Sequence, residues 1–325
     1  MIAARPRDIL DFVVARGREG TACVLVTLVG IEGGSSRSIG TQMAVAADGR
    51  RIGSFSGGCI EDAIATEAIE ALHDGWGRVV RYGVGSPYID IRLPCGGGID
   101  LLFTPAPAID AITSAVDALA NRNAVALRLD SDSVSYCGAA DPASWDGQAI
   151  TIAIQPQLKV NAFGQGDDLT AFARLASHFG ALVHAFTPDE TTHSELAAAS
   201  IATTQLTSRT ALAPVTSDPW TANLFLFHGR DWEEHLLPQV LQLRGFYHGA
   251  IGSRRTHAAR LAMLREAGTG EAQINRLRGH IGLIPATRDP ATLALSILGE
   301  IVADYNALNH WSYWTGQPLT SAAEA

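Results

Sequence analysis

A strand that runs directly into a glycine loop and then into a helix opens the second half of the chain. Residues 158–163 fit an interior strand, Gly164-Gln165-Gly166 follows at once, and apolar residues then recur at helical spacing. A second apolar strand, residues 181–186, comes next and is followed by Asp189. This order is typical of the start of a doubly wound nucleotide-binding fold. The sequence therefore predicts a Rossmann-like parallel sheet over residues 158–310.

The glycine loop departs from the dinucleotide-binding pattern in two ways. Leu169 stands where the third glycine would be, and Asp167 and Asp168 stand where a pyrophosphate would approach. Two carboxylates there would repel a dinucleotide phosphate unless they turn away from it. Asp189 could bind a ribose or cap the following helix, and we favour the cap. The pattern thus supports the fold more than it supports NAD(P) bound at this loop.

A second candidate anion site follows a later strand. Residues 247–251 read as a strand that runs into Gly252-Ser253-Arg254-Arg255, ahead of a helix predicted over residues 258–267. Glycine and serine at a strand end, followed by two arginines and a helix, suit a phosphate or a carboxylate. The alternative is that the arginines pair with the acidic residues Asp231, Glu233 or Glu234, which also lie just past a strand end.

His228 and Asp231 follow the buried strand at residues 223–227. A histidine and a carboxylate at the carboxyl end of a parallel strand resemble a metal-binding or acid/base pair, because ligands bind at that edge of open sheets. The alternative is a hydrogen-bonded structural pair.

The first half contains a hairpin that leads into a cysteine-bearing loop. Residues 42–47 and 51–55 are strands joined by Asp48-Gly49, and the second strand breaks at Ser56-Gly57-Gly58. A helix then runs from Cys59 to about residue 73 and stops at Gly75. Adjacent glycines leave N–H groups free at a helix start, and a thiol there tends to have a lowered pKa. Cys95-Gly96-Gly97-Gly98 forms a second such loop.

Three loops of this half, residues 33–40, 56–59 and 83–98, each begin or end a strand of what we predict to be one small mixed sheet. Loops held at strand ends often carry function, so their polar groups could converge. The candidate contacts for an anionic or thiol-seeking ligand are Ser35, Ser36, Arg37, Gly57, Gly58, Cys59, Glu61, Cys95, Gly96 and Gly97. The alternatives are an ion pair between Arg37 and Glu61, cysteines that simply fill the core, and glycines that only make turns.

Residues 108–157 read as the remainder of the first domain, supplying edge strands around a polar, turn-rich stretch at 131–147. The expected organisation is an N-terminal mixed α/β domain over residues 1–157, the Rossmann-like domain over 158–310, and a tail over 311–325.

Composition excludes several functional classes. The net charge is −9 and no basic run offsets it, which argues against a nucleic-acid partner. Four cysteines without a Cys-x-x-Cys pair argue against zinc and a disulfide framework, and free thiols suggest a reducing compartment. The first residues lack the apolar core of a signal peptide. The longest apolar run, residues 22–31, is about half the length that a membrane span needs. We therefore expect a cytoplasmic protein without a membrane segment.

Several longer motifs resemble one family. This family is the XdhC/CoxI family. Three segments of the chain resemble its N-terminal domain: G-G-S-S-R-S-I-G-T-Q-M-A-V-A-A-D-G (residues 33–49), S-G-G-C-I-E (56–61) and P-C-G-G-G-I-D-L-L-F-T-P (94–105). The family's C-terminal Rossmann domain resembles Y-H-G-A-I-G-S-R-R-T-H-A-A-R-L (247–261) and G-L-I-P-A-T-R-D-P-A-T-L-A-L-S-I-L-G-E-I-V-A (282–303). The resemblance covers nearly the whole chain, in the same order.

The resemblance implies a maturation factor for molybdenum hydroxylases of the xanthine dehydrogenase type. Such proteins bind molybdenum cofactor (molybdopterin), protect it, help it acquire its terminal sulfur, and hand it to the apo-enzyme. The implied partners are an apo molybdenum hydroxylase client and a cofactor sulfurase. Glycine-rich helix starts and Arg37 could hold the cofactor's phosphate, and Cys59 or Cys95 could approach its metal. Apolar helices leave surface for a homodimer.

Three functional hypotheses follow, in order of preference. The first is a cofactor-binding chaperone with no turnover of its own. The second is an NAD(P)-dependent oxidoreductase with His228 and Asp231 near the nicotinamide. The third is a nucleotide-handling enzyme in which Gly252, Ser253 and Arg254 hold phosphate while Asp231 or Glu234 binds Mg²⁺.

Overall fold

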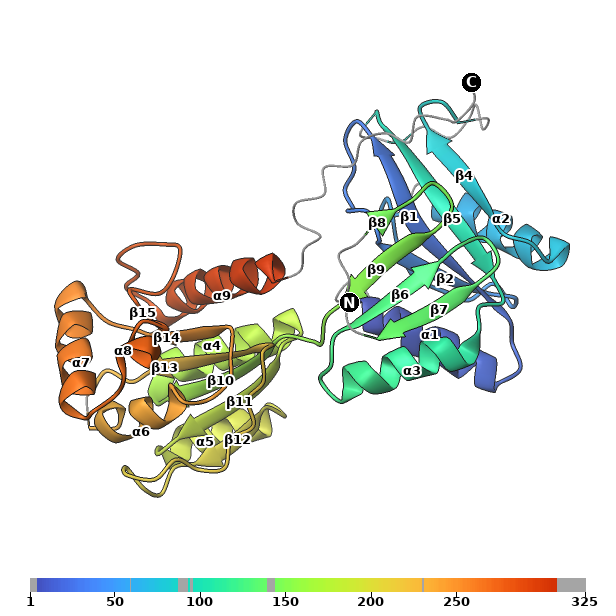
Figure 1. Cartoon of the computed structure of the whole chain (residues 1–325). Helices are drawn as coiled ribbons and strands as arrows, with labels where there is room; N and C mark the ends of the chain where they lie inside the picture. The colour runs from blue at the N-terminus through green and yellow to red at the C-terminus, as the bar shows by residue number, and fades with distance from the viewer. Residues whose placement is uncertain are drawn as a thin grey trace. The chain divides into compact units, whose positions relative to one another are not determined.

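The computed structural model describes residues 5–58, 60–86, 93, 96–138, 144–229 and 231–308. These residues form two compact units, the first running to Pro156 and the second from Gln157 to Leu308. The first unit holds two antiparallel sheets and the second holds one parallel sheet (Figure 1). The predicted combination of an N-terminal α/β domain with a C-terminal Rossmann-like domain is confirmed.

The elements of the first unit are α1 (Pro6–Arg18), β1 (Cys23–Glu32), β2 (Gln42–Ala46), β3 (Arg51–Gly53), α2 (Glu61–Asp74), β4 (Arg78–Gly83), β5 (Gly98–Pro105), α3 (Ile109–Ala120), β6 (Val125–Leu129), β7 (Val134–Gly138), β8 (Ser144–Trp145) and β9 (Ile150–Ile154). One sheet has the strand order β3-β2-β1-β5-β4, and the other has the order β7-β6-β9-β8.

Three predictions about this unit are wrong. The sheet predicted to be mixed is antiparallel at every pairing. Residues 108–157 do not add edge strands to it, because they pair among themselves as a second antiparallel sheet. The stretch at 131–147, predicted to be turns, contributes β7 and β8 to that second sheet.

The long apolar run of β1 is explained by burial on both of its faces. Val24, Val26 and Leu28 belong to a core shared with α2. Leu25 and Val29 belong to a second core shared with α1, α3 and the second sheet. A strand covered on both faces needs apolar side chains at every position. β1 therefore fixes the centre of the unit, and the loops at its ends are held against rigid neighbours.

The elements of the second unit are β10 (Lys159–Gly164), α4 (Gly166–Phe179), β11 (Leu182–Thr187), α5 (Glu190–Ala198), β12 (Ala202–Gln205), β13 (Thr221–Leu226), α6 (Glu233–Val240), β14 (Tyr247–Ala250), α7 (Arg254–Glu266), α8 (Glu271–Ile274), β15 (Leu277–Gly279) and α9 (Pro290–Ala307). All strand pairings are parallel, in the order β12-β11-β10-β13-β14-β15. This is the Rossmann order, whose direction of winding reverses between β10 and β13.

Helices cover both faces of the parallel sheet. Val160 and Ala162 of β10 share one core with α4 and α9. Phe163 shares the other core with α6, α7 and α8, and its ring stacks between those of Phe186 and Phe225. Figure 1 shows α4 and α9 together on their side of the sheet. Among the helices of the described residues, none has both the length and the apolar character that a membrane crossing requires.

One helix start differs from its prediction. The helix expected over residues 258–267 is α7, which begins at Arg254. Ser253 is its N-cap residue, because the Ser253 hydroxyl accepts a hydrogen bond from the Thr256 amide. The paired arginines therefore lie in the first helical turn and not in a loop ahead of it.

Candidate functional site

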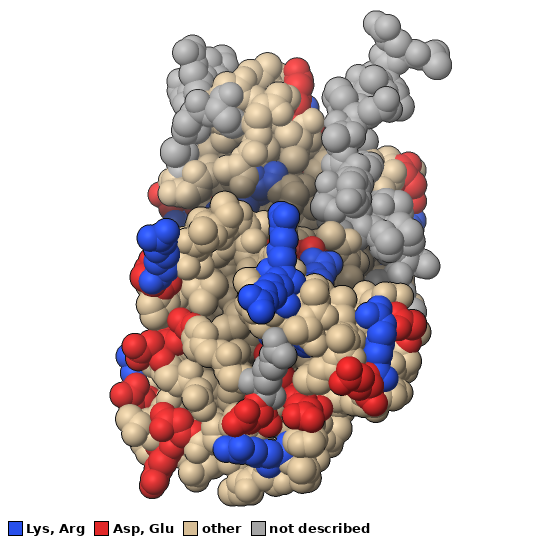
Figure 2. All heavy atoms as spheres, turned by 90° about the vertical axis from the view of Figure 1, so that its left-hand side faces the viewer, with Lys and Arg blue, Asp and Glu red and all other residues tan. Residues whose placement is uncertain are grey.

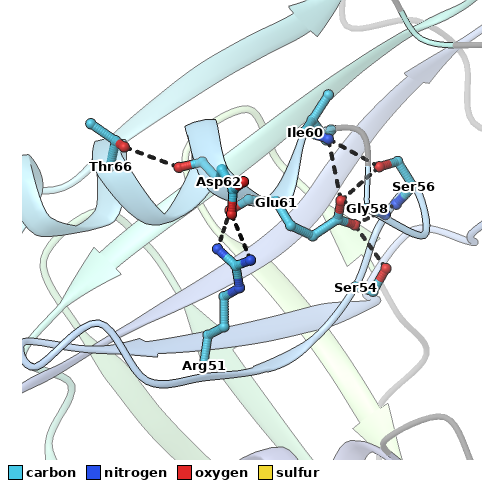
Figure 3. A network of polar contacts seen from close by, with 8 residues as sticks. All are labelled: Arg51, Ser54, Ser56, Gly58, Ile60, Glu61, Asp62 and Thr66. Carbon is cyan, nitrogen blue, oxygen red and sulfur yellow. Dashed lines mark hydrogen bonds and ion pairs between the residues drawn. The ribbon is translucent and has the colours of Figure 1, made fainter.

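The loop between β3 and α2 is built around the carboxylate of Glu61 (Figure 3). Oε1 accepts hydrogen bonds from the Ser54 hydroxyl at 2.7 Å, the Phe55 amide at 2.9 Å and the Ser56 amide at 2.8 Å. Oε2 accepts from the Ser56 hydroxyl at 2.8 Å and from the amides of Gly58 and Ile60, at 2.8 and 3.2 Å. The side chain is buried, with 5% of the residue exposed.

These contacts keep Glu61 ionised. Burial alone would raise the pKa of its carboxyl, but the hydrogen bonds from the Ser56 amide and from the Ser54 and Ser56 hydroxyls outweigh it and lower the pKa to about 2. The loop amides that we expected to face a ligand therefore face an internal anion. Gly57 and Gly58 allow this by adopting φ of 79° and 126°.

The loop at residues 33–40 packs directly against this one. The Ser36 hydroxyl donates to the Phe55 carbonyl at 3.0 Å, and Nε of Arg37 donates to the Ser54 carbonyl at 3.0 Å. The Ser35 hydroxyl folds back onto the Arg37 backbone. An ion pair between Arg37 and Glu61 is not formed, so that alternative is wrong. No carboxylate among the described residues pairs with Arg37, so none of them neutralises its charge.

The third loop approaches through its glycines. A Cβ on Gly97 would lie 2.5 Å from the Glu32 carbonyl oxygen and 2.7 Å from that of Gly34, so only glycine fits between these backbones. Gly96 precedes it with a φ of 69° and open space around it. The three loops predicted to converge are therefore brought together. Cys59 and Cys95, named in the same prediction, lie outside the described residues.

A cluster of charges supports this loop arrangement. Arg81 of β4 pairs with Asp100 of β5, with Nη1 3.1 Å from Oδ2, and also with Glu32 at the end of β1. Its Nε donates to the Val84 carbonyl at 2.7 Å. The guanidinium thus joins three strand ends around the start of β5. Sequence reasoning missed this cluster, because its members lie on three separate strands.

In the second unit, two polar side chains meet where the winding of the sheet reverses. His228 Nε2 lies 2.8 Å from Oδ2 of Asp168, joining the carboxyl end of β13 to the first turn of α4. The predicted partner of His228 was Asp231, and that prediction is wrong: Asp231 pairs with Arg209 at 3.3 Å. The Mg²⁺ role proposed for Asp231 therefore loses support, because this carboxylate already has a cation beside it.

The groups that would hold a dinucleotide are engaged by the chain itself. The Gly166 amide donates to the Thr192 hydroxyl at 3.0 Å. Asp189 accepts from the Thr192 amide at 2.8 Å, so the favoured cap role is confirmed. Asp168 lies in the first turn of α4, where a pyrophosphate would need the helix N-terminus. These residues do not fit a dinucleotide held in the usual way.

The start of α7 presents cations instead. Gly252 has a φ of 139°, and the exposed residues Arg254 and Arg255 follow Ser253. The predicted alternative, in which they pair with Asp231, Glu233 or Glu234, is wrong among the described residues. Glu233 pairs with Arg260 through two hydrogen bonds of 2.9 and 2.7 Å, both side chains being buried. Arg260 also donates to the carbonyl of Ile251, which fixes the strand end before Gly252.

Charges elsewhere are interspersed. Figure 2 views the molecule from the side on which α7 lies in Figure 1, and its basic side chains occur in small groups with acidic ones between them. Within the part of the chain that the structure describes, no three histidine, cysteine or acidic side chains gather as they would around a metal ion. Arg37 in one unit and Arg254 and Arg255 in the other are among the arginines for which no carboxylate of the described residues is a partner.

Comparison with known proteins gives consistent results. Residues 160–301 match the XdhC Rossmann domain, and residues 17–83 match the XdhC and CoxI family. The sequence is 35% identical over 299 residues to the molybdenum cofactor insertion chaperone PaoD of Escherichia coli, covering 91% of this chain and 88% of that protein. A crystal structure from Bacillus halodurans, described as a xanthine dehydrogenase, has the same fold. Its TM-score is 0.72 and its identity 19%, over 92% of this chain and 96% of that one.

Proposed function

Because the chain belongs to the XdhC and CoxI family, we propose that it binds molybdenum cofactor and delivers it to an apo molybdenum hydroxylase of the xanthine dehydrogenase type. The observation that carries the proposal is the near full-length similarity to a molybdenum cofactor insertion chaperone. A cytoplasmic location, a homodimer and cooperation with a cofactor sulfurase remain predictions that accompany it.

The first unit supplies the groups for this task. Arg37 would hold the cofactor's phosphate, because its guanidinium already donates to the Ser54 carbonyl and has no described carboxylate to neutralise it. Ser35 and Ser36 fix the backbone around it. When bound, the cofactor would bring a molybdenum centre that accepts a thiolate, and Cys59 and Cys95 are the candidates to provide one.

The start of α7 is a separate candidate anion site, in the second unit. Backbone N–H groups at a helix N-terminus attract an anion, and Arg254 adds a positive charge beside Gly252 and Ser253. The chain has no catalytic turnover of its own in this role, because its task is to bind, protect and release the cofactor.

An oxidoreductase function is less well supported by the geometry. The Gly166 amide donates to the Thr192 hydroxyl, and Asp189 caps α5. Asp168 places a carboxylate in the first turn of α4, where a pyrophosphate would bind. Calorimetric titration with NAD+ and NADP+ should therefore show no binding even at millimolar concentration. Tight binding of either would favour the oxidoreductase.

The test of the proposal uses protein co-expressed with an active molybdenum cofactor pathway. We expect stoichiometric molybdenum, and pterin fluorescence after oxidation, in the wild-type protein. Arg37→Gln should lose much of both. Arg50→Gln is the matched control, because Arg50 lies in the neighbouring turn between β2 and β3, is exposed, and among the described residues pairs only with Asp48. Wild-type protein with neither molybdenum nor pterin would refute cofactor binding.

Two further measurements separate the steps. Cys59→Ala and Cys95→Ala variants test the thiols: unchanged retention in both would remove the thiolate role while leaving the phosphate contacts. Loaded wild-type protein mixed with the apo-hydroxylase should restore activity, whereas cofactor-free protein should not. Retention without transfer would support storage and contradict delivery.

A further inference from the structure

We propose that Glu61 is a positioning residue: its carboxylate, held inside the protein, fixes the shape of the chain on both sides of residue 59. The inference rests on the proposed function, because a fixed loop matters here for holding the cofactor. Sequence analysis placed Glu61 among the residues that would contact a ligand. The hydrogen bonds assign it the opposite role: its carboxylate is an internal anion that accepts the hydrogen bonds a ligand would otherwise accept.

The acceptor capacity of the carboxylate is already filled. Each oxygen accepts three hydrogen bonds, Oε1 from Ser54, Phe55 and Ser56, and Oε2 from Ser56, Gly58 and Ile60. An ionised carboxylate offers about four lone-pair sites in all. Glu61 therefore has no free position for a metal ion or for a donor on a ligand.

The contacts enclose residue 59 in the sequence. The amides of Gly58 and Ile60, one residue before it and one after, donate to the same oxygen of Glu61. Gly57 and Gly58 hold left-handed backbone conformations that side chains disfavour. The direction of the chain into and out of this position is thus set by one carboxylate.

Glu61 can do this because it is itself anchored. It is the first residue of α2, and both the N-cap residue Ile60 and Ile64 of the helix are buried in the core with β1. Nη1 of Arg51 donates to the Glu61 carbonyl at 3.2 Å, and Nη2 pairs with Asp62 at 2.6 Å (Figure 3). The helix therefore carries the carboxylate to a fixed place, and the loop closes over it.

The test replaces the carboxylate by its amide. In Glu61→Gln an NH₂ group replaces one carboxylate oxygen and faces donors that need an acceptor. The hydrogen bonds to that oxygen are lost, while the size of the side chain is kept. Glu67→Gln is the matched control. Glu67 lies on the same helix, is similarly buried at 6% against 5%, and pairs with Arg78 away from the loop. Ser54→Ala, which removes one donor and no charge, is the milder variant if Glu61→Gln folds poorly.

The first readout is thiol reactivity in cofactor-free protein, resolved by mass spectrometry of labelled peptides. Cys59 in Glu61→Gln should react at least about fivefold faster than in wild type, the factor that corresponds to about 1 kcal/mol. A looser loop and the loss of a negative charge two residues away in the sequence both act in this direction. Cys23 is buried and reports global opening, so its rate should stay unchanged, and the exposed Cys137 is the reference.

The second readout is molybdenum retained after co-expression, which should fall at least about fivefold in Glu61→Gln and stay unchanged in Glu67→Gln. Equal Cys59 rates in the two variants would overturn the positioning role. A faster Cys59 rate with molybdenum absent from wild type would instead uphold the role and refute the proposed function. The two failures are therefore distinguishable, because the thiol measurement needs no cofactor.

Discussion

His248 of β14 is buried in the second unit, and its Nε2 lies 2.6 Å from Nη2 of Arg276. Since a guanidinium can only donate, the imidazole must accept and is therefore neutral. Burial, helped by the charge of Arg276, lowers the pKa of His248 to about 4. Arg276 also donates to the carbonyls of Leu241 and Leu243, so the pair joins β14 to the end of α6.

This lowered pKa predicts a loss of stability in mild acid. The unfolded chain binds a proton at its ordinary pKa of about 6.5 while the folded chain does not, so stability falls as pH drops from about 6.5 to about 4. Between pH 7 and pH 5 the His248 contribution should fall by about 2 kcal/mol. Urea unfolding of wild type and His248→Gln at both pH values measures it. The same pH dependence in both proteins would contradict the assignment.

Residue-scale roles were the hardest to predict from the sequence. Glu61 was correctly placed in the loop cluster, but an acidic residue after two glycines can equally bind a ligand or accept from its own loop. His228 was expected beside Asp231, its neighbour in the sequence, whereas its partner Asp168 is distant in the chain. That pairing depends on the adjacency of β10 and β13, which no local pattern specifies.

At the scale of elements, Gly97 decides how closely β5 approaches the loop after β1. Ala at this position would force a Cβ against two backbone carbonyls, which cannot move as a side chain can. We expect Gly97→Ala to cost about 3 kcal/mol. Gly96→Ala should cost only about 1 kcal/mol, because its Cβ meets nothing and the penalty is the left-handed backbone alone.

Denaturant midpoints of the two variants provide the measurement. A similar cost for both would mean that the loops can separate without loss, and would argue against a rigid meeting of the three loops. A larger cost for Gly97→Ala, together with reduced molybdenum retention, would support it.

Elements with a clear signal at both ends were predicted well. The hairpin closed by Asp48 and Gly49 is present as β2 and β3, and α2 ends where Gly75 adopts a φ of 77°. The predicted start of α7 came too late in the sequence, because a first turn with Arg254 and Arg255 lacks the acidic residues that usually mark a helix start. β7 was missed because most of its side chains are exposed and give no apolar run.

At the scale of the whole molecule, the two units have separate cores, and stability should be lost in two steps. Arg260→Leu leaves Glu233 buried without its partner, which should cost about 3–5 kcal/mol. We expect this to lower one calorimetric transition by roughly 10 °C and leave the other in place. Gly97→Ala, which lies in the first unit, should lower only the transition that Arg260→Leu leaves in place.

The double variant Arg260→Leu with Glu233→Leu is the control. It removes both charges, so it should recover much of the stability that the single variant loses. If either single variant lowered both transitions together, the units would not unfold independently.

The network around Glu61 also has a consequence for the order of folding. Its hydrogen bonds join residues between one and seven positions apart, whereas Arg37 reaches Ser54 across 17 positions. Contacts of low sequence separation cost little loop entropy and can form early. The folding φ-value of a variant is the fraction of its stability loss that already appears in the folding transition state. We expect this fraction to be near 1 for Ser54→Ala and near 0 for Gly97→Ala, and the reverse order would contradict this. The nascent chain would then form the hydrogen bonds between Glu61 and the loop after β3 before β4 and β5 have been synthesised.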